Sequence, residues 1–180
     1  MQQKYFKKGL ITGIILGTIL AVSALGYLYY VSKRNMAQSD AIGKSKHFKE
    51  LNLPLKDLEG KPVDMMQFSD KYVLVNFWGT WCLPCVQEMP MLQNEYKALK
   101  EKYVFVMISD EDPQTIKAFK EKKGYDFVFV RSEEILQSMI GVFPTTFILD
   151  KSQRIIFTKT GSFENMDPNG FKQLLLKQIK

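Results

Sequence analysis

Metal-ligating side chains are scarce in this sequence of 180 residues, which has only two cysteines, Cys82 and Cys85, and one histidine, His47. A structural zinc site needs about four ligands, so this set does not complete one. Covalent haem attachment needs a histidine directly after the second cysteine of a C-x-x-C pair, and Val86 holds that place. The sequence therefore predicts neither a metal nor a cofactor.

An excess of basic charge is absent from most of the chain, although the formal net charge is +6. Seven of the 25 lysines and arginines precede His47, but of the 19 acidic residues only Asp40 does. The remainder of the chain is therefore electrically balanced. It lacks the positive field with which proteins bind a phosphate backbone, so we expect no nucleic-acid partner.

Charge is missing altogether from Gly9 to Val31, a run of 23 residues rich in Ile, Leu and Val. A helix of this length measures roughly 35 Å, enough to cross a hydrocarbon core of about 30 Å. Val22-Ser23-Ala24 resembles a signal-peptide cleavage site, but the apolar run continues beyond it, which favours an uncleaved anchor. The predicted organisation is a basic tail (1–8), a transmembrane anchor (9–31), a polar linker (32–46) and a domain (47–180).

Small residues recur along one side of the predicted span. Gly9, Gly13 and Gly17 lie four positions apart, and small residues at this spacing let two membrane helices approach closely. A weak homodimer through this face is one prediction; the alternative is that glycine is simply common in membrane helices. Basic residues flank both ends of the span in similar numbers, so they do not decide its orientation.

Apolar runs of strand length alternate with helical patterns in the rest of the chain. Two short extended pieces around 57–61 predict an N-terminal β-hairpin. Strands are expected at 72–78, 103–108, 127–130, 145–149 and 155–160. Helices are expected after Cys82 and after three predicted N-cap residues, Asp112, Ser132 and Asp167. The early alternation predicts a parallel core and the last two strands an antiparallel pair. The fold class is therefore α/β, with a mixed central sheet flanked by helices.

The cysteine pair stands where the first buried strand meets the first helix. Unpaired N–H groups at a helix N-terminus stabilise a thiolate, so Cys82 is expected to be the exposed nucleophile. Cys85, one turn later on the apolar side, is expected to be shielded and to attack the sulfur of Cys82. Trp81 and Pro84 restrict the turn. A purely structural disulfide would close too short a loop to constrain the chain much. The pattern therefore indicates a thiol–disulfide redox centre.

Two stretches of the sequence resemble the thioredoxin superfamily, namely 73–90 (VLVNFWGTWCLPCVQEMP) and 143–147 (FPTTF). The closest match is its membrane-anchored TlpA/ResA-like branch of extracytoplasmic thiol–disulfide oxidoreductases, over roughly residues 50–180. The resemblance implies a thioredoxin fold and a cis peptide bond before Pro144, facing the dithiol. It also implies that the backbone of Thr145 pairs with a substrate strand. From the residues alone, Pro144 only opens a strand.

The resemblance also addresses the proton acceptor for Cys85. Thioredoxins proper carry a buried acid where this chain has Asn76, which does not titrate. Glu88 lies three residues after Cys85 on the same helix side. In the ResA-like branch a glutamate at this place is linked to cysteine deprotonation, and the resemblance implies that role for Glu88. The alternative is a solvated helix carboxylate.

Other positions near the pair are less informative. Leu83 departs from the family pattern, in which a polar residue or glycine often separates the cysteines, so it should alter the redox poise in a direction that the sequence does not reveal. Asp110 and Glu111 follow the end of a parallel strand, where open α/β sheets bind ligands, but no role is assigned to either. Asp112 is predicted to cap a helix.

These observations predict a membrane-tethered enzyme that reduces disulfides in extracytoplasmic proteins, with apocytochrome c among the candidate clients. Disulfides persist outside the cytoplasm, which places the domain on the extracytoplasmic (periplasmic) side of the cell membrane. A membrane electron donor would re-reduce the pair. One alternative is a peroxidase-type redoxin. Another is a non-enzymatic copper-handling assembly protein of similar fold, although its typical wider cysteine spacing and downstream histidine are both missing.

Overall fold

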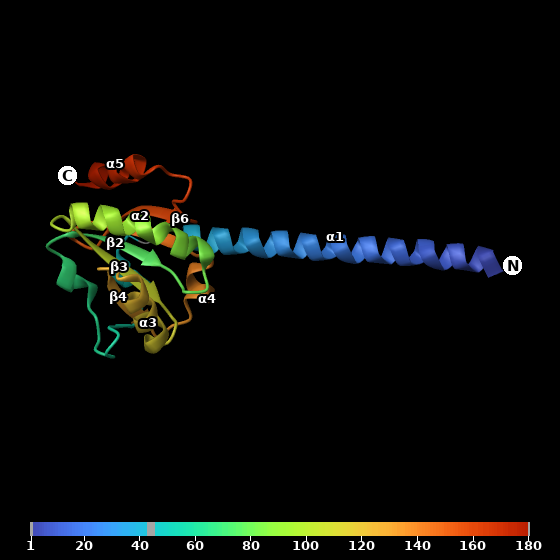
Figure 1. Ribbon diagram of the computed structural model, residues 1–180, viewed down its shortest axis with the longest axis horizontal. Coiled ribbons are helices and arrows are strands. Elements are labelled where there is room, and N and C mark those ends of the chain that lie inside the picture. The colour runs from blue at the N-terminus through green and yellow to red at the C-terminus, as the bar shows by residue number, and fades with distance from the viewer. Residues whose placement is uncertain (1, 43–45, 180) are drawn as a thin grey trace. The chain divides into compact units, whose positions relative to one another are not determined.

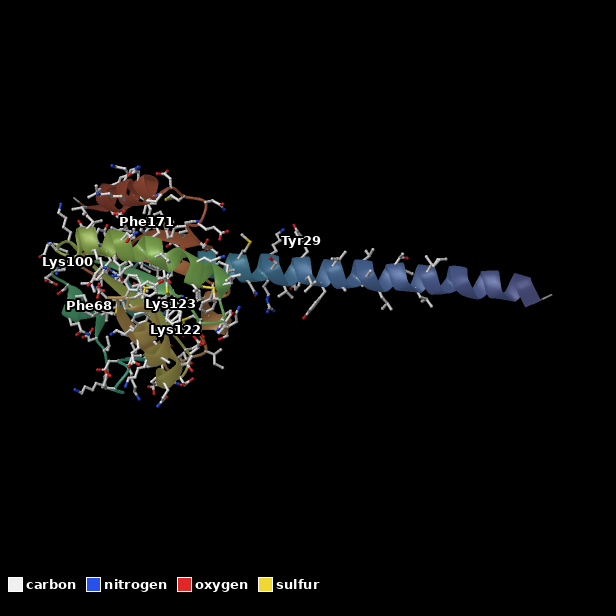
Figure 2. All side chains as sticks on the ribbon, in the orientation of Figure 1. Tyr29, Phe68, Lys100, Lys122, Lys123 and Phe171 are labelled. Atoms are coloured by element: carbon white, nitrogen blue, oxygen red, sulfur yellow. A yellow bond between two sulfur atoms is a disulfide. The ribbon has the colours of Figure 1, made fainter. Side chains whose placement is uncertain are left out.

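The computed structural model describes residues 2–42 and 46–179, with side chains at 13–37 and from Lys46 onward. The chain divides into two compact units, Met1–Asn35 and Met36–Lys180. Most of helix α1 (Gln2–Ile42) makes up the first unit (Figure 1). Its stretch Gly13–Ala37 is long and apolar enough to cross a membrane, judged by length and composition. Side chains of this stretch, Tyr29 among them, stand exposed along the helix (Figure 2).

Helix α1 continues further than the sequence pattern predicts. The polar linker was expected from Ser32, yet the helix continues to Ile42. The physical reason is that no proline or glycine interrupts this stretch, and most of its residues are good helix formers. Residues 43–45 of the predicted linker lie outside the described residues. The basic tail, the anchor boundaries and the dimer through Gly9, Gly13 and Gly17 stay predictions.

The second unit is built on a six-stranded sheet with the strand order β1-β4-β3-β2-β5-β6. Strands β2, β3 and β4 are parallel, and β1, β5 and β6 join the sheet antiparallel, so the predicted mixed sheet is confirmed. The N-terminal hairpin is minimal, because only an isolated bridge from Lys56 to Pro62 faces the two-residue strand β1. The strands are β1 (Leu55–Lys56), β2 (Tyr72–Phe77), β3 (Tyr103–Ser109), β4 (Val128–Ser132), β5 (Thr145–Leu149) and β6 (Ile155–Thr160).

Two of the predicted helix caps are confirmed and one is wrong. Asp112 and Asp167 each accept a hydrogen bond from a backbone N–H of the turn that follows, at 2.9 and 3.0 Å. Ser132 belongs to β4 instead, and Asp110 accepts the bond from Leu136 N at 2.8 Å. The helices are α2 (Leu83–Leu99), α3 (Pro113–Lys123), α4 (Leu136–Ile140) and α5 (Pro168–Gln178), with 3-10 turns η1 (Phe48–Leu51) and η2 (Met65–Phe68).

Alternation along β2 assigns its side chains to two cores. Leu74 and Trp78 pack with residues of α2, α3 and α5 on one face of the sheet. Val73, Val75 and Phe77 pack on the other face with residues of η1, β1, η2 and α4. Because side chains at every second position share a face, Asn76 lies on the α2 side. The sheet therefore presents a buried polar group to the helix that carries the cysteines.

Candidate active site

The cysteine pair begins helix α2, as the sequence predicts. Cys82 is the N-cap residue, and its sulfur accepts a hydrogen bond from the backbone N–H of Cys85 at 3.3 Å. The two residues form a disulfide with their Cα atoms 5.3 Å apart. Pro84 lies in the first turn of the helix. Backbone N–H groups in this turn have no intrahelical partner, so proline, which lacks the N–H, costs no hydrogen bond there. The N–H groups of this turn are therefore available to stabilise negative charge on Cys82 after reduction.

The exposure expected for Cys82 is not found in the disulfide form. Its side chain is only 4% exposed, and that of Cys85 is fully buried. The accessible side chains are the neighbours Trp81 and Leu83, which are 60% and 66% exposed. Both are apolar, so the turn that carries the sulfur atoms has a hydrophobic rim. Cys82 lies behind this rim and belongs, together with Cys85, to the core cluster on the α2 side of the sheet.

Trp81 links the cysteine turn to the proline loop. Its indole ring lies edge-on to the ring of Phe143, with centroids 5.4 Å apart. A Cβ atom at Gly79 would come within 2.6 Å of the indole nitrogen, so only glycine lets the indole lie this close to the backbone. The peptide bond between Phe143 and Pro144 is cis, which confirms the conformation that the resemblance implies. The cis-proline loop thus lies beside the residue that precedes Cys82.

Thr145 does not offer its backbone to a substrate strand. It lies within β5, paired with Phe77 of β2 on one side and Thr160 of β6 on the other. Because both neighbours are strands of the sheet, no open edge is left at this residue, and this part of the prediction is wrong. The hydroxyl of Thr145 donates to the carbonyl of Val142 at 2.8 Å. Its contribution to the site is therefore to hold the loop that leads into Pro144.

Glu88 is buried rather than solvated, being only 2% exposed. Its Oε1 accepts a hydrogen bond from Asn76 Nδ2 at 2.9 Å, and its Oε2 accepts one from the backbone N–H of Phe163 at 2.9 Å. Asn76 also donates to Thr146 Oγ1 at 3.0 Å, which fixes its amide. The two positions that the sequence singles out thus meet. Asn76 places the carboxylate of Glu88 against the sheet, on the face where thioredoxins proper carry their acid.

Burial also changes the acidity of this carboxyl group. Desolvation raises the pKa of Glu88 from 4.5 to about 7, although the hydrogen bonds from Phe163 and Asn76 and the nearby charge of Lys159 act in the opposite direction. At neutral pH the group is therefore divided between its acid and carboxylate forms. A base with a pKa near the operating pH is well suited to accept and return a proton.

Glu111, to which the sequence assigned no role, holds the turn before the cysteines. Its carboxylate accepts bonds from Thr80 N at 2.7 Å and Thr80 Oγ1 at 2.5 Å. Ser109 Oγ donates to the same carboxylate at 3.2 Å, and Arg131 Nε donates to the backbone carbonyl of Glu111 at 3.2 Å. The only sequence signal was its place after a parallel strand. The contact joins residues 31 positions apart, which no local pattern reveals.

Replacing Glu111 by glutamine should destabilise the protein by about 1 to 2 kcal/mol, because the amide has a single acceptor for two donors of Thr80. Urea unfolding measures this change, and faster exchange of the Thr80 amide proton should accompany it. Glu134→Gln, at an exposed position in the loop before α4, is the matched control and should change stability little. Unchanged exchange at Thr80 in the Glu111 variant would contradict the assignment.

The arrangement supplies a cysteine pair, a buried carboxyl group and an apolar rim. These groups are sufficient for thiol–disulfide exchange, in which a thiolate attacks a sulfur and a second thiol resolves the product. Within residues 46–179, no three His, Cys, Asp or Glu side chains come together as metal ligands.

Comparison with known proteins gives the same picture. The redoxin family model matches residues 41–175. "Thiol-disulfide oxidoreductase ResA" from Bacillus cereus (strain ATCC 10987 / NRS 248) is 35% identical over 156 residues, 83% of this chain and 87% of the relative. The ResA of another Bacillus cereus strain is 31% identical over 172 residues, 93% of this chain and 96% of the relative. The solution structure of a thiol:disulfide interchange protein from Bacteroides sp. aligns with a TM-score of 0.60 at 22% identity. That alignment covers 71% of this chain and 85% of the other, and it confirms the thioredoxin-like fold.

Proposed function

The chain belongs to the redoxin family as a ResA-like thiol–disulfide oxidoreductase, and we propose that it is a membrane-tethered reductase of disulfides in extracytoplasmic proteins. The observation that carries the proposal is the pairing of a helix-capping Cys82 with a buried Glu88 one turn behind Cys85. Cys82 supplies the thiolate that attacks, and Glu88 accepts a proton at neutral pH.

Reduction of a client proceeds in two exchanges. The thiolate of Cys82 attacks one sulfur of a client disulfide, and the other client sulfur leaves as a thiolate. Cys85 then passes its proton to the carboxylate of Glu88 and attacks the sulfur of Cys82. The bond between Cys82 and the client breaks, and the second client thiolate leaves. The client gains two electrons and the Cys82–Cys85 pair loses them, so a membrane electron donor must restore the dithiol before the next turnover.

Two observations support the proposed location, the apolar helix and the chemistry of the cysteine pair. The Gly13–Ala37 stretch of α1 supports a tether in the membrane. A client disulfide survives only where glutathione and thioredoxin do not reduce it, which supports an extracytoplasmic domain. Apocytochrome c is one candidate client, because its two haem-binding thiols must be reduced before haem is attached. A weak dimer through Gly9, Gly13 and Gly17 would bring two domains to one place on the membrane.

Three measurements test the proposal. A reporter fused after Lys180 should be active only outside the cytoplasm, and a cytoplasmic signal would overturn the location. The reduced protein should reduce a protein disulfide and leave hydroperoxide almost unconsumed; rapid peroxide consumption would favour the peroxidase-type redoxin.

Cys85→Ala should accumulate a mixed disulfide with its client in cells, and the Cys82→Ala/Cys85→Ala double variant is the matched control that should accumulate none. Mass spectrometry of the trapped complex then identifies the client.

A further inference from the structure

A lysine of the edge strand β6 lies in the same row of the sheet as Asn76. Asn76 of β2 stands opposite Thr146 of β5, and Thr146 stands opposite Lys159 of β6. Residues directly opposite one another in neighbouring strands share a face of the sheet. Phe157, two positions before Lys159, packs against the core cluster on the α2 side. The side chain of Lys159 is therefore on the face that carries α2.

The ammonium group of Lys159 reaches the loop that holds Glu88. Its Nζ lies over the ring of Phe163, 5.6 Å from the ring centroid. The backbone N–H of the same phenylalanine donates to Glu88 Oε2 at 2.9 Å. The ring of Phe163 is buried and packs on that of Phe171, with centroids 4.8 Å apart. Phe163 therefore lies next to both groups and keeps the ammonium group on the same side of the sheet as the carboxyl group.

The charge of Lys159 is not committed to another partner. Within residues 46–179, no carboxylate forms a direct ion pair with it. Its side chain is half-buried, and Glu88 is almost completely buried. Charges that are partly removed from water are screened less than charges at the surface. Lys159 can therefore stabilise the carboxylate form of Glu88 without touching it.

Two charged side chains act on the carboxyl group of Glu88 in the described residues 46–179. Burial raises the pKa of Glu88 to about 7; the charge of Lys159 lowers this pKa, and that of Glu164, exposed in the loop before α5, raises it. On α2 itself, the other titratable neighbour is Cys85 once the disulfide is reduced. Strand β2 and the backbone before α5 supply hydrogen bonds but no charge. Lys159 is thus the cation that favours ionisation of this group.

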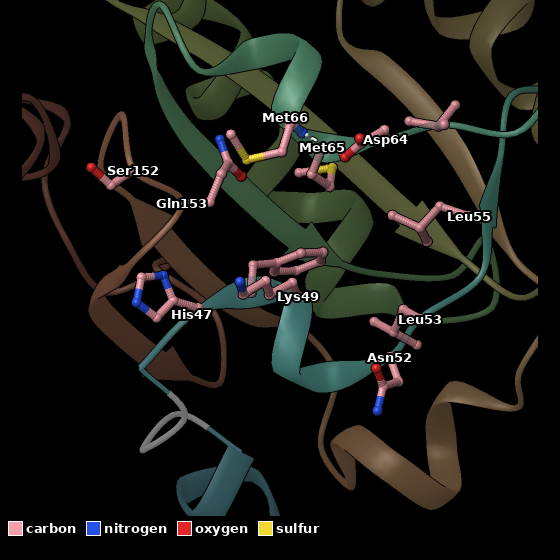
Figure 3. Close-up of a pocket in the computed structure, with 12 residues that line it drawn as sticks. His47, Lys49, Asn52, Leu53, Leu55, Asp64, Met65, Met66, Ser152 and Gln153 are labelled. Atoms are coloured by element: carbon pink, nitrogen blue, oxygen red, sulfur yellow. Dashed lines mark hydrogen bonds between the residues drawn. The ribbon is translucent and has the colours of Figure 1, made fainter.

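Titratable groups also lie on the opposite face of the sheet. His47, Lys49 and Asp64 line a pocket there (Figure 3), next to the core cluster that contains Phe48. His47 is the only histidine of the chain, and histidine is the side chain that most often titrates near neutral pH. Because this pocket and Glu88 belong to different faces, a pH dependence of the redox step near pH 7 is not assigned to His47.

We propose that Lys159 is a positioning residue of the redox centre, whose ammonium group favours the carboxylate form of Glu88 when Cys85 gives up its proton. The step moves one proton from the sulfur of Cys85 to the carboxylate, and Lys159 acts only by its charge. The inference rests on the proposed role of Glu88 as proton acceptor. It extends the redox centre to the edge strand β6 and gives Lys159 a part in setting the pH range in which mixed disulfides are resolved.

A titration of the oxidised full chain in lipid nanodiscs tests the effect of the charge directly. With ¹³C-labelled glutamate, the carboxyl signal of Glu88 is identified by its loss in Glu88→Gln. Lys159→Met keeps the apolar stem over Phe163 and removes the charge, so the midpoint of this signal should rise by about 0.5 pH units. Lys159→Arg keeps the charge and should keep the wild-type midpoint. Equal midpoints in Lys159→Met and the wild type would overturn the proposal.

Two further variants complete this titration. Lys151→Met, at an exposed position in the turn between β5 and β6, is the matched control and should leave the midpoint unchanged. Glu164→Gln removes the charge that acts in the opposite direction, so it should lower the midpoint. A midpoint that rises equally in Lys151→Met and Lys159→Met would show a general effect of protein charge and would contradict the specific role of Lys159.

The rate at which Cys85 resolves the mixed disulfide gives a second readout. In Lys159→Met this rate should fall about threefold well below pH 7 and should be unchanged at high pH, where the carboxylate form is complete in both proteins. A pH dependence that survives in Glu88→Gln would refute the proposed role of Glu88. A pH dependence that disappears in Glu88→Gln but does not move in Lys159→Met would refute the role of Lys159 alone.

Discussion

Replacing Cys82 by serine should lower disulfide reduction by at least about 10³-fold, because a serine hydroxyl is not ionised at neutral pH and forms no mixed disulfide. Cys85→Ala should behave differently. Cys82 still caps α2 in that variant and still attacks, so the first exchange occurs once per molecule and then stops. A stopped-flow assay with a disulfide that releases a coloured thiol separates the two results. Cys82→Ser should give no burst of released thiol, whereas Cys85→Ala should give a burst of one equivalent and no further turnover.

The position of each sulfur gives the expected asymmetry. The backbone N–H of Cys85 points at the sulfur of Cys82, and Cys82 adjoins the exposed Trp81 and Leu83. Cys85 is completely buried in the α2 core, where a client disulfide does not reach it. A full burst from Cys82→Ser would show that Cys85 attacks clients directly, and the assigned roles of the two cysteines would then have to be exchanged.

Replacing Glu88 by glutamine should slow turnover by about 10²-fold, the scale expected for loss of a general base. The burst in a Cys85→Ala background should keep its rate, because the first exchange does not use Glu88. The fall of the resolving rate on acidification should be centred near pH 7 in the wild type, where the carboxyl group titrates, and should be absent from the variant. Glu121→Gln, an exposed change on α3, is the matched control. An unchanged resolving rate in the Glu88 variant would exclude the proton-acceptor role.

The same group makes stability depend on pH. Between about pH 4.5 and 7 the unfolded chain releases the proton of Glu88 while the folded chain retains it, so stability falls as pH rises through this window and is constant above it. A pKa change from 4.5 to about 7 corresponds to a loss of roughly 3 kcal/mol. Urea unfolding at pH 4.5 and pH 8 should therefore show this decline in the wild type and not in Glu88→Gln. The burial of Glu88 is therefore expected to lower the stability of the protein at neutral pH.

Local signals in the sequence predicted much of the fold. Apolar runs marked the central strands, and the Asp-Pro pairs at Asp112 and Asp167 marked two helix starts, because a cap and the turn that it caps are adjacent in the chain. The position of Cys82 at the tip of α2 followed from a strand that ends and a helix that begins. The cis bond at Pro144 came from the resemblance, since nothing in the neighbouring residues requires it.

Contacts between distant segments account for what the sequence did not reveal. Glu111 accepts a hydrogen bond from Thr80, and Asp110 accepts one from Leu136. Each bond joins loops that come together only when the sheet has formed. The pairing of β5 with β2 and β6 determines which residues flank Thr145 in the sheet. The sequence of a single strand does not reveal this register. Burial of Cys82 likewise depends on the neighbouring elements. Such features arise from the packed structure and have no sequence signal of their own.

The surroundings of the two tryptophans give the protein an optical reporter of its own redox state. Trp78 is fully buried in the α2 core, and Trp81 is largely exposed next to Cys82. The chain has no other tryptophan. Emission from Trp81 should therefore respond to the form of the adjacent sulfur and to a client that covers the indole, whereas the buried Trp78 is shielded from solvent. With Trp78 changed to phenylalanine, attack and release become visible as changes in fluorescence without any added label.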